Sequence, residues 1–309
     1  MFNQRCENQI FSQIGKLDKA TLHNVQHVTE FCKEIHEGML NSEKKWDSDP
    51  TYMQMQIKID ESIRSTMIDW LIKIHYNFKL LPESLFLTVN VIDRYFSLYQ
   101  IAKKEVQLVA IAALLIVTKY EEIYPPLLKD FIYISDNNYS AEEILDMEKK
   151  ILFALDFDIS LGTAYRFLER FAKLGKIDDV TFFLAQYMLE LGLLDSKMSQ
   201  FNQSLQAVSA IYMAKKYLML QNPNSQDLGS FFISDLGVAY TMEQVKGCAK
   251  CFNQLATLIQ RSKLQNLVKK FKGSKYFEVA RIVTSSIQRK ESQDNVKIQA
   301  NNSAQAKTT

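Results

Sequence analysis

VQLVAIAALLIVTK, residues 106–119, is the stretch of sequence that decides the fold. Apolar side chains fill almost every position up to Val117, with Gln107 as the interruption. A helix that is apolar nearly all round is stable only where other helices surround it. The run is also shorter than the ~20 residues that a bilayer-spanning helix needs. The sequence therefore predicts a buried central helix over about 103–119 inside a bundle of helices.

Amphipathic segments flank this central helix on both sides. One apolar stripe recurs at three- and four-residue steps: Ile63, Met67, Trp70, Leu71, Ile74 and Phe78. Such spacing predicts a helix with one buried face, and Pro82 fits the first position of the next helix. Downstream, a short helix is expected at 127–134, and Ser140 with Glu143 forms a capping box that opens another. Residues 60–156 are therefore predicted to form a five-helix unit.

A second helical series begins near Thr163 and repeats features of the first. Lys119-Tyr120 and Phe86-Leu87 recur 97 residues later, as Lys216-Tyr217 and Phe183-Leu184 (216 − 119 and 183 − 86). Several matches at a single offset indicate a duplicated helical domain.

We expect four parts along the chain. They are an arm at 1–27, a first domain with its preceding helix at 28–160, a second domain at 161–286 and a tail at 287–309. The preceding helix, expected at about 25–45, has apolar side chains on or near one face: Val28, Phe31, Ile35 and Leu40. The tail is rich in Gln, Lys, Asn, Ser and Ala. Because such a composition cannot bury a core, we expect it to be disordered.

The composition argues against several classes of protein. The 37 basic residues nearly balance the 35 acidic ones, so no strong attraction to nucleic acid or membrane is expected. The 9 glycines and 5 prolines are few for a strand-rich fold, which needs many turns. The 4 cysteines are too few and too scattered for a secreted disulfide framework.

No pattern in the sequence indicates catalysis, a cofactor or a metal. The glycines form no phosphate-binding loop. His23 and His27 have no third ligand placed near them, so two solvated histidines are the better interpretation. Cys248 and Cys251 have no second cysteine pair and are better interpreted as small buried residues. We therefore expect a protein that is not an enzyme.

The informative residues are charges within apolar stripes. Arg64 and Asp93 lie among apolar residues on neighbouring predicted helices, and buried charges are seldom unpaired. We predict that they pair as a structural ion pair. Lys119 ends the most apolar helix, and Glu148 interrupts another stripe. Physical reasoning leaves two interpretations open for these two residues, an internal salt bridge or solvated rim and a partner-binding site.

Several segments together resemble the cyclin family. The run PTYMQMQIKIDESIRSTMIDWLIKIH (50–75) looks like the entry to a cyclin box, and LFLTVNVIDRYFS (85–97) and VQLVAIAALLIVTKYEEIYPP (106–126) look like its second and third helices. DFIYISDNNYSAEEILDMEKKILFALDFDI (130–159) resembles the rest of that box. The similarity is to the mitotic A/B group, nearer the B-type around 193–204. It implies an all-α fold of two tandem five-helix cyclin boxes with an N-terminal helix.

The resemblance also implies a partner. Cyclins are non-catalytic subunits that bind and activate a cyclin-dependent serine/threonine kinase through its PSTAIRE-like helix, here in mitotic control. The matching kinase-binding residues in this chain are Lys119, Glu122, Glu148, Leu152, Phe157 and Ile159. The resemblance further implies that Arg64 and Asp93 form an internal lock, and that the protein acts in the nucleus and cytoplasm.

A second implied site is a shallow groove that docks substrates or inhibitors carrying an Arg-x-Leu motif. Ile63, Met67, Trp70 and Gln107 match its lining. Thr66 replaces a large aliphatic side chain of the family, and Lys73 replaces an acidic one that attracts the docking arginine. Because like charges repel, we predict weak or altered docking of basic Arg-x-Leu peptides.

Two other functions remain open from the sequence. One is a cyclin-fold binding module in transcription that contacts DNA or a polymerase, and the other is a helical scaffold that binds no kinase. The near-neutral charge argues against duplex DNA as a partner, because DNA-binding surfaces are normally basic.

Overall fold

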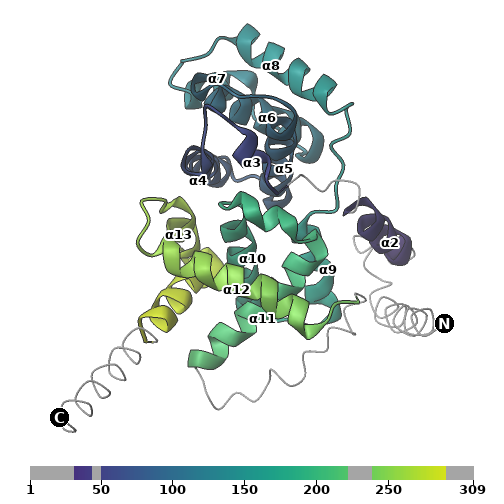
Figure 1. Cartoon of the computed structure of the whole chain (residues 1–309), viewed down its shortest axis with the longest axis vertical. Helices are drawn as coiled ribbons and strands as arrows, with labels where there is room; N and C mark the ends of the chain where they lie inside the picture. The colour runs from purple at the N-terminus through teal and green to yellow at the C-terminus, as the bar shows by residue number, and fades with distance from the viewer. Residues whose placement is uncertain (1–30, 44–49, 222–238, 290–309) are drawn as a thin grey trace.

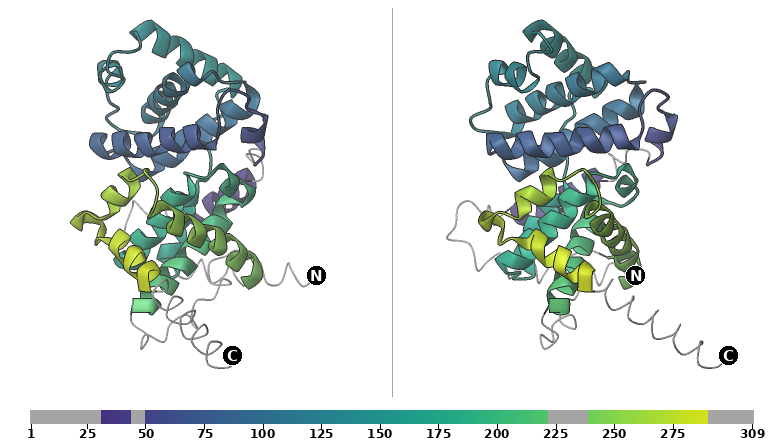
Figure 2. Two further views of the ribbon diagram at one scale, coloured as in Figure 1. Left: turned by 60° about the vertical axis from the view of Figure 1, so that its left-hand side comes forward. Right: turned by 90° about the vertical axis from the view of Figure 1, so that its left-hand side faces the viewer.

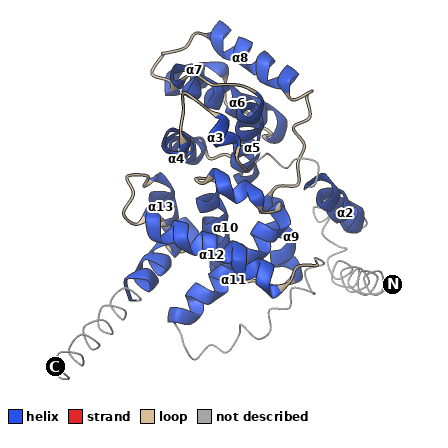
Figure 3. Cartoon of the chain, in the orientation of Figure 1, coloured by secondary structure: helices blue, strands red, loops and turns tan. Residues whose placement is uncertain are grey.

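The computed structural model describes residues 31–43, 50–221 and 239–289. Helices and short 3-10 turns make up the regular structure of these residues, with no strand among them (Figure 1, Figure 3). The helices form two bundles that lie one above the other in each view (Figure 1, Figure 2). This arrangement confirms the prediction of an all-helical chain with two tandem helical domains.

The first bundle surrounds the predicted central helix. Its elements are α3 (Tyr52–Met55), α4 (Glu61–Phe78), α5 (Pro82–Leu98), η3 (Lys103–Glu105), α6 (Val106–Glu121), α7 (Leu128–Ile134) and α8 (Ala141–Ala154). In α6 every residue from Val109 to Thr118 is buried. Helices α4, α5, α7 and α8 all contact α6, which explains why this segment needs no polar face.

Local sequence signals set the helix ends. Pro82 occupies the first turn of α5, as predicted. At α8 the Glu143 amide donates to Ser140 Oγ at 3.2 Å, and the Ser140 amide donates to Glu143 Oε2 at 2.8 Å. This is the predicted capping box. Helix α4 ends at Phe78, and the next residue, Lys79, caps it in a left-handed conformation with φ 55°.

The second bundle follows after a short linker. Its elements are α9 (Ala164–Leu174), α10 (Asp179–Gly192), η4 (Ser196–Gln200), α11 (Gln203–Gln221), α12 (Met242–Ile259), α13 (Asn266–Phe271), η6 (Ser274–Tyr276) and a helical segment at 279–289. The side chains of Thr163, Asp178 and Thr241 accept hydrogen bonds at the starts of α9, α10 and α12. Helix α13 also packs on α4, so it joins the two bundles.

The helix predicted before the first domain packs on the second bundle instead. Helix α2 (Cys32–Glu43) lies beside α9 and contacts α11 (Figure 1). The predicted apolar face is wrong at Phe31 and Ile35, which are exposed. The buried side chains are His36, whose ring lies 6.0 Å from that of Phe167, and Glu43. Glu43 accepts hydrogen bonds from Ser204, and Met39 and Leu40 pack against the core, so polar and apolar contacts together set which face turns inward.

The ends of the chain bear on two further expectations. The last helical segment continues through Ile287, which is buried, so the expectation of disorder fails for residues 287–289. The reason is that Val283 and Ile287 are four residues apart and extend one apolar stripe into the core. The arm at 1–27, the first part of the N-terminal helix at 25–30 and the rest of the tail at 290–309 lie outside the described residues.

Candidate partner-binding site

Lys119 and Glu148 meet at the surface of the first bundle. Lys119 comes from the last turn of α6 and Glu148 from the middle of α8. The lysine Nζ lies 2.7 Å from Oε1 and 2.9 Å from Oε2 of the carboxylate. The lysine side chain is 49% exposed and that of the glutamate 12%. Because the ammonium faces solvent, it remains able to donate to other hydrogen-bond partners, whereas the carboxylate is largely covered.

Aromatic side chains stand exposed on the same helix and on the segment after it. Phe153, on α8, is 70% exposed and Phe157 is 58% exposed. Their rings meet edge to face with centroids 5.4 Å apart. Leu152 and Ile159, also predicted to contact a kinase, are half-buried and pack against the core. The predicted residues of α8 and its exit therefore combine core packing with an exposed apolar surface.

The backbone after α8 holds Phe157 outward in an unusual conformation. Asp156 and Phe157 both have positive φ angles, 50° and 57°. Such angles are uncommon for a bulky residue and persist only where surrounding contacts enforce them. Here the Phe157 amide donates to the Leu152 carbonyl at 2.9 Å. Backbone strain of this kind occurs often at functional sites.

Sequence reasoning missed part of this surface. Phe153 was not predicted, although it stands out of phase with the buried stripe of Ile144, Met147 and Ile151. That phase offset is the signal that identifies it. Ile123 and Tyr124, in the turn after α6, are also largely exposed. Exposed apolar side chains that gather near a pair of charges are characteristic of protein interfaces.

Glu122, predicted to bind the kinase, has contacts within the chain. Its Oε1 accepts hydrogen bonds from the Leu81 amide at 2.8 Å and from Ser84 Oγ at 2.6 Å. These donors lie at the start of α5, where a carboxylate satisfies backbone amides that have no helical partner. The structure thus gives Glu122 a role in fixing α5 against the end of α6, whereas its contact with a kinase stays a prediction.

The residues predicted for the docking groove line one open cavity. It encloses about 400 Å³ between α4 and the η3–α6 corner. The lining residues are Ser62, Ile63, Thr66, Met67, Trp70, Lys103, Val106 and Gln107. Met67 is buried, and Trp70 is half-buried and packs on the core. Lys103 was not predicted, and its place at the corner before α6 could not be read from helical spacing.

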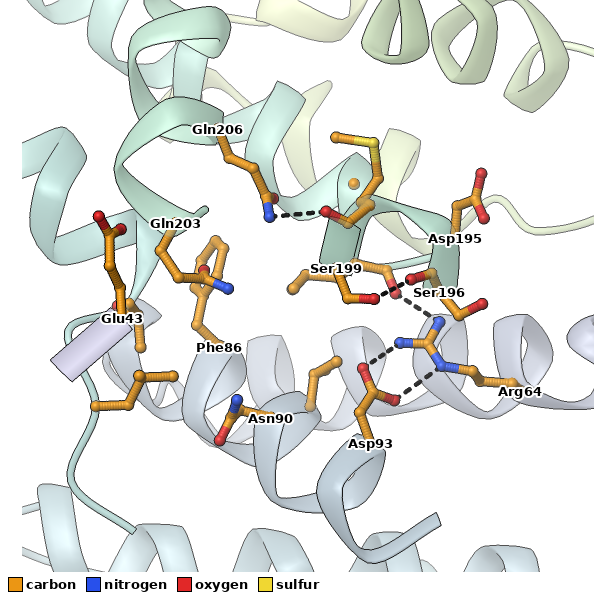
Figure 4. Close-up of a pocket in the computed structure, with 16 residues that line it drawn as sticks. Glu43, Arg64, Phe86, Asn90, Asp93, Asp195, Ser196, Ser199, Gln203 and Gln206 are labelled. Carbon is orange, nitrogen blue, oxygen red and sulfur yellow. Dashed lines mark hydrogen bonds and ion pairs between the residues drawn. The ribbon is translucent and has the colours of Figure 1, made fainter. Parts of the chain in front are cut away.

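Arg64 and Asp93 form an ion pair on the side of the first bundle that faces the second bundle (Figure 4). Arg64 Nη2 lies 2.6 Å from Asp93 Oδ2, and Nε lies 2.9 Å from Oδ1. Tyr52 joins them by donating to Asp93, and Arg64 Nη1 donates to the Leu193 carbonyl at 3.0 Å. Burial alone would lower the pKa of Arg64, but the Asp93 carboxylate raises it above its ordinary value. The pair therefore ties α4 and α5 to the second bundle as well as to each other.

Figure 4 shows the small cleft that this pair borders, with Arg64 and Asp93 on one side and Ser196 and Gln206 on the other. The cleft encloses about 60 Å³, room for a few water molecules. Gln206 donates to the Met198 and Phe201 carbonyls, so its amide is engaged in holding η4. The cleft is therefore a polar junction between the bundles and too small for a typical organic ligand.

The described residues contain no group of three or more His, Cys, Asp or Glu side chains that could hold a metal ion. None of the helices in these ranges is both long and apolar enough to cross a membrane. Cys248 is buried, and burial raises the pKa of its thiol to about 12, which keeps it protonated. Cys251 is half-buried beside it. His23 and His27 lie outside the described residues.

Comparison with known proteins places this architecture in a family. Residues 34–160 match the family described as "Cyclin, N-terminal domain", and residues 162–285 match "Cyclin, C-terminal domain". The chain belongs to the cyclin family. A viral cyclin from herpesvirus saimiri has a similar fold, with a TM-score of 0.61 at 19% identity, covering 74% of this chain and 99% of its own. The two bundles of this cyclin thus correspond to its two matched domains.

Related cyclins of the B-type are similar in sequence. The G2/mitotic-specific cyclin-B of Dictyostelium discoideum is 35% identical over 84% of this chain and 58% of its own length. Cyclin-B1-3 of Arabidopsis thaliana is 38% identical over 82% of this chain and 58% of its own length. This cyclin therefore spans less than two thirds of the length of these relatives.

Proposed function

We propose that this cyclin is a regulatory subunit that binds and activates a cyclin-dependent serine/threonine kinase in mitotic control, without catalytic chemistry of its own. Membership of the cyclin family and the similarity to a G2/mitotic-specific cyclin-B support this proposal. The observation that carries it is the Lys119–Glu148 pair together with the exposed Phe153 and Phe157 on the helix of Glu148 and its exit. This arrangement combines one basic and one acidic anchor with apolar area, which suits a helix as partner.

The expected partner element is the mobile PSTAIRE-like helix of the kinase. In the free chain the charges of Lys119 and Glu148 satisfy each other. On binding, the ammonium would donate to carbonyl groups of the kinase, and the carboxylate would accept from its amides. Phe153 and Phe157 would bury their exposed rings against apolar side chains, which supplies non-directional binding energy.

Activation would then follow from a shift in population. A kinase needs a Lys–Glu ion pair that forms only when its mobile helix is turned inward. A partner that binds this inward state better than the outward state raises its population by that difference in affinity. All phosphoryl-transfer chemistry stays in the kinase, and this cyclin contributes only binding energy.

The test is a kinase assay with a purified PSTAIRE-type kinase, with and without this cyclin. Strong activation by the wild-type chain and little by Lys119→Ala/Glu148→Ala is the expected result. The matched control is Asp146→Ala/Lys149→Ala, which removes another ion pair of α8 whose side chains are 67% and 70% exposed. We expect this control to activate as well as the wild type.

Two outcomes would contradict the proposal. Equal activation by the site variant and the control variant would move the kinase contact elsewhere on the surface. A lack of binding and activation across a panel of such kinases would favour the transcription or scaffold functions instead. Circular dichroism of each variant verifies that a loss of activation is not a loss of folding.

We propose two further features of this function. Substrates or inhibitors of the kinase would dock in the groove beside Trp70, away from the Lys119–Glu148 pair. The protein would act in the nucleus and cytoplasm, which imaging of a tagged chain through the cell cycle would test.

A further inference from the structure

Short-range hydrogen bonds shape the turn after α8, which carries the exposed ring of Phe157. The Phe157 amide donates to the Leu152 carbonyl at 2.9 Å, and the Asp158 amide donates to the Leu155 carbonyl at 2.9 Å. Each donor lies only a few residues after its acceptor, so these bonds fix the form of the turn. They do not fix where the turn lies on the rest of the bundle.

Arg94 ties the same turn to α5. Its Nη1 donates to the Asp158 carbonyl at 2.7 Å, across 64 residues of sequence. The arginine side chain is half-buried. Burial lowers the pKa of Arg94, and the negative charge of Asp158 opposes this change. Hydrogen bonds from a charged donor are stronger than those between neutral groups, so this contact holds the turn firmly.

The helix that carries Arg94 is a rigid support. Ile92 and Phe96 are buried on α5, and Asp93 holds Arg64 of α4 through an ion pair of 2.6 Å. Adjacent residues of a helix point about 100° apart, so Asp93 and Arg94 reach different partners from one turn of α5. A functional group is placed most accurately when its support is a packed helix.

We propose that Arg94 is a positioning residue for kinase binding, which holds the turn after α8 so that Phe157 already has its binding geometry in the free chain. This inference rests on the proposed function, because Phe157 is one of the residues predicted to contact the kinase. Without Arg94 the turn would move against α5, and ordering it on binding would reduce the affinity. The arginine acts through the turn and not by touching the kinase.

Amide hydrogen exchange on the free chain tests the tether without a kinase. Arg94→Met removes the guanidinium but keeps an unbranched stem. In this variant the amides of Phe157 and Asp158 should exchange about tenfold faster than in the wild type, because a charged hydrogen bond is lost. Arg94→Lys retains a charged donor and should restore part of the protection. The matched control is Arg170→Met, which removes a half-buried arginine from α9 and should leave this turn unchanged.

The affinity for a purified PSTAIRE-type kinase tests the consequence of the tether. Titration calorimetry is expected to show that Arg94→Met binds about three- to tenfold more weakly than the wild type, the range that ordering one segment on binding costs. Arg94→Lys should recover part of this loss, and Arg170→Met should bind like the wild type. Circular dichroism at the temperature of the titration verifies that each variant is folded.

Double variants separate positioning from direct contact with the kinase. With Phe157→Ala already present, Arg94→Met should weaken binding by less, because the ring that it positions is missing. With Lys119→Ala already present, the two losses should multiply. Lys119 lies one turn before Glu122, which binds Ser84, and Ser84 lies ten residues before Arg94 (94 − 84), about 15 Å along α5.

Three results would overturn the inference: unchanged exchange of the turn in Arg94→Met, unchanged affinity of Arg94→Met for the kinase, or an equal loss of affinity with and without Phe157→Ala. The last result would indicate direct contact or a general loss of structure. Failure of the proposed function is distinguishable, because the wild type would then bind no kinase while the turn still exchanged faster in Arg94→Met.

Discussion

The ammonium of Lys270 lies 2.6 Å and 2.7 Å from the two carboxylate oxygens of Glu190, and both side chains are fully buried. The pair joins α13 to α10 inside the second domain. Gln186 donates to the same carboxylate at 2.9 Å, and the Lys270 ammonium stands 5.2 Å from the centre of the Phe271 ring. Each charge is therefore compensated by several partners, as burial of an ion requires.

Removal of one partner of this pair is expected to destabilise the fold strongly. Lys270→Met keeps the length of the side chain but leaves the Glu190 carboxylate buried without its cation. We expect the free energy of unfolding to fall by about 3–5 kcal/mol, the usual cost of an uncompensated buried charge. Urea denaturation followed by circular dichroism measures this change.

The double variant Lys270→Met/Glu190→Leu separates charge from packing. With both charges replaced by apolar side chains of similar volume, we expect most of the lost stability to return. Lys269→Met is the control, because Lys269 is the exposed neighbour on the same helix and should change stability by no more than about 0.5 kcal/mol. Equal losses in the single and double variants would show that packing, not charge, matters here.

Arg64→Ala is expected to be comparably destabilising. It would leave Asp93 buried with only the Tyr52 hydroxyl and would free the Leu193 carbonyl in the other domain. We predict a loss of about 3–5 kcal/mol in the free energy of unfolding, measured by thermal or urea denaturation. Lys73→Ala, an exposed substitution on the same helix, is the control. A shift in melting temperature no larger than that of the control would contradict the prediction.

Much of the fold could be predicted from the sequence because its signals are local. The all-apolar segment at 106–117, Pro82 and the Ser140–Glu143 capping box each determine structure within a few residues. The orientation of α2 could not be predicted, since it depends on contacts of His36 and Glu43 with a distant helix. Apolar spacing indicated Phe31 and Ile35 as the buried face, and polar and apolar contacts together reversed that choice.

The candidate site was predictable where a residue breaks a pattern. Glu148 interrupts an apolar stripe, and Arg64 and Asp93 do the same on their helices. Lys270 was missed because it follows Lys269 directly, and a pair of adjacent lysines resembles a solvated surface. Its partner Glu190 is 80 residues away, so only the packing of α10 on α13 brings them together.

Gly192→Ala tests a close approach between α10 and α12. A Cβ atom at Gly192 would lie 2.9 Å from Cε1 of the buried Phe252 ring, so the ring would have to move. Overpacking of this kind costs about 1–3 kcal/mol, which outweighs the helix propensity gained from alanine, about 1 kcal/mol. We expect urea denaturation to show a net decrease in the free energy of unfolding. The decrease should be smaller when Phe252→Leu is already present.

Gly247→Ala is the matched control for this prediction. Gly247 also lies within a helix, α12, but a Cβ there would have nothing within 4 Å. The substitution should therefore stabilise the protein by up to about 1 kcal/mol. If both glycine substitutions changed stability in the same direction and to the same extent, the contact with Phe252 would not explain the effect of Gly192→Ala.

Glu83 is expected to make stability depend on pH. It lies buried at the start of α5, where Thr163 Oγ1 donates to its Oε2 at 2.5 Å across the domain junction. Burial raises the pKa of this carboxyl from 4.5 to about 7, although Thr163 and Arg166 oppose the change. Between these two pH values the folded state binds more protons than the unfolded state, so stability falls as pH rises through this window.

Glu83→Gln removes this titration while keeping a neutral group that accepts from Thr163. The unfolding free energy of the variant minus that of the wild type should therefore rise by up to about 3 kcal/mol between pH 4.5 and pH 7. His75, whose pKa burial lowers to about 3, has the opposite pH effect below neutrality, but it is present in both proteins and cancels in the difference. Urea titrations at several pH values measure this quantity. A difference that stays constant with pH would show that the Glu83 carboxyl titrates equally in the folded and unfolded states.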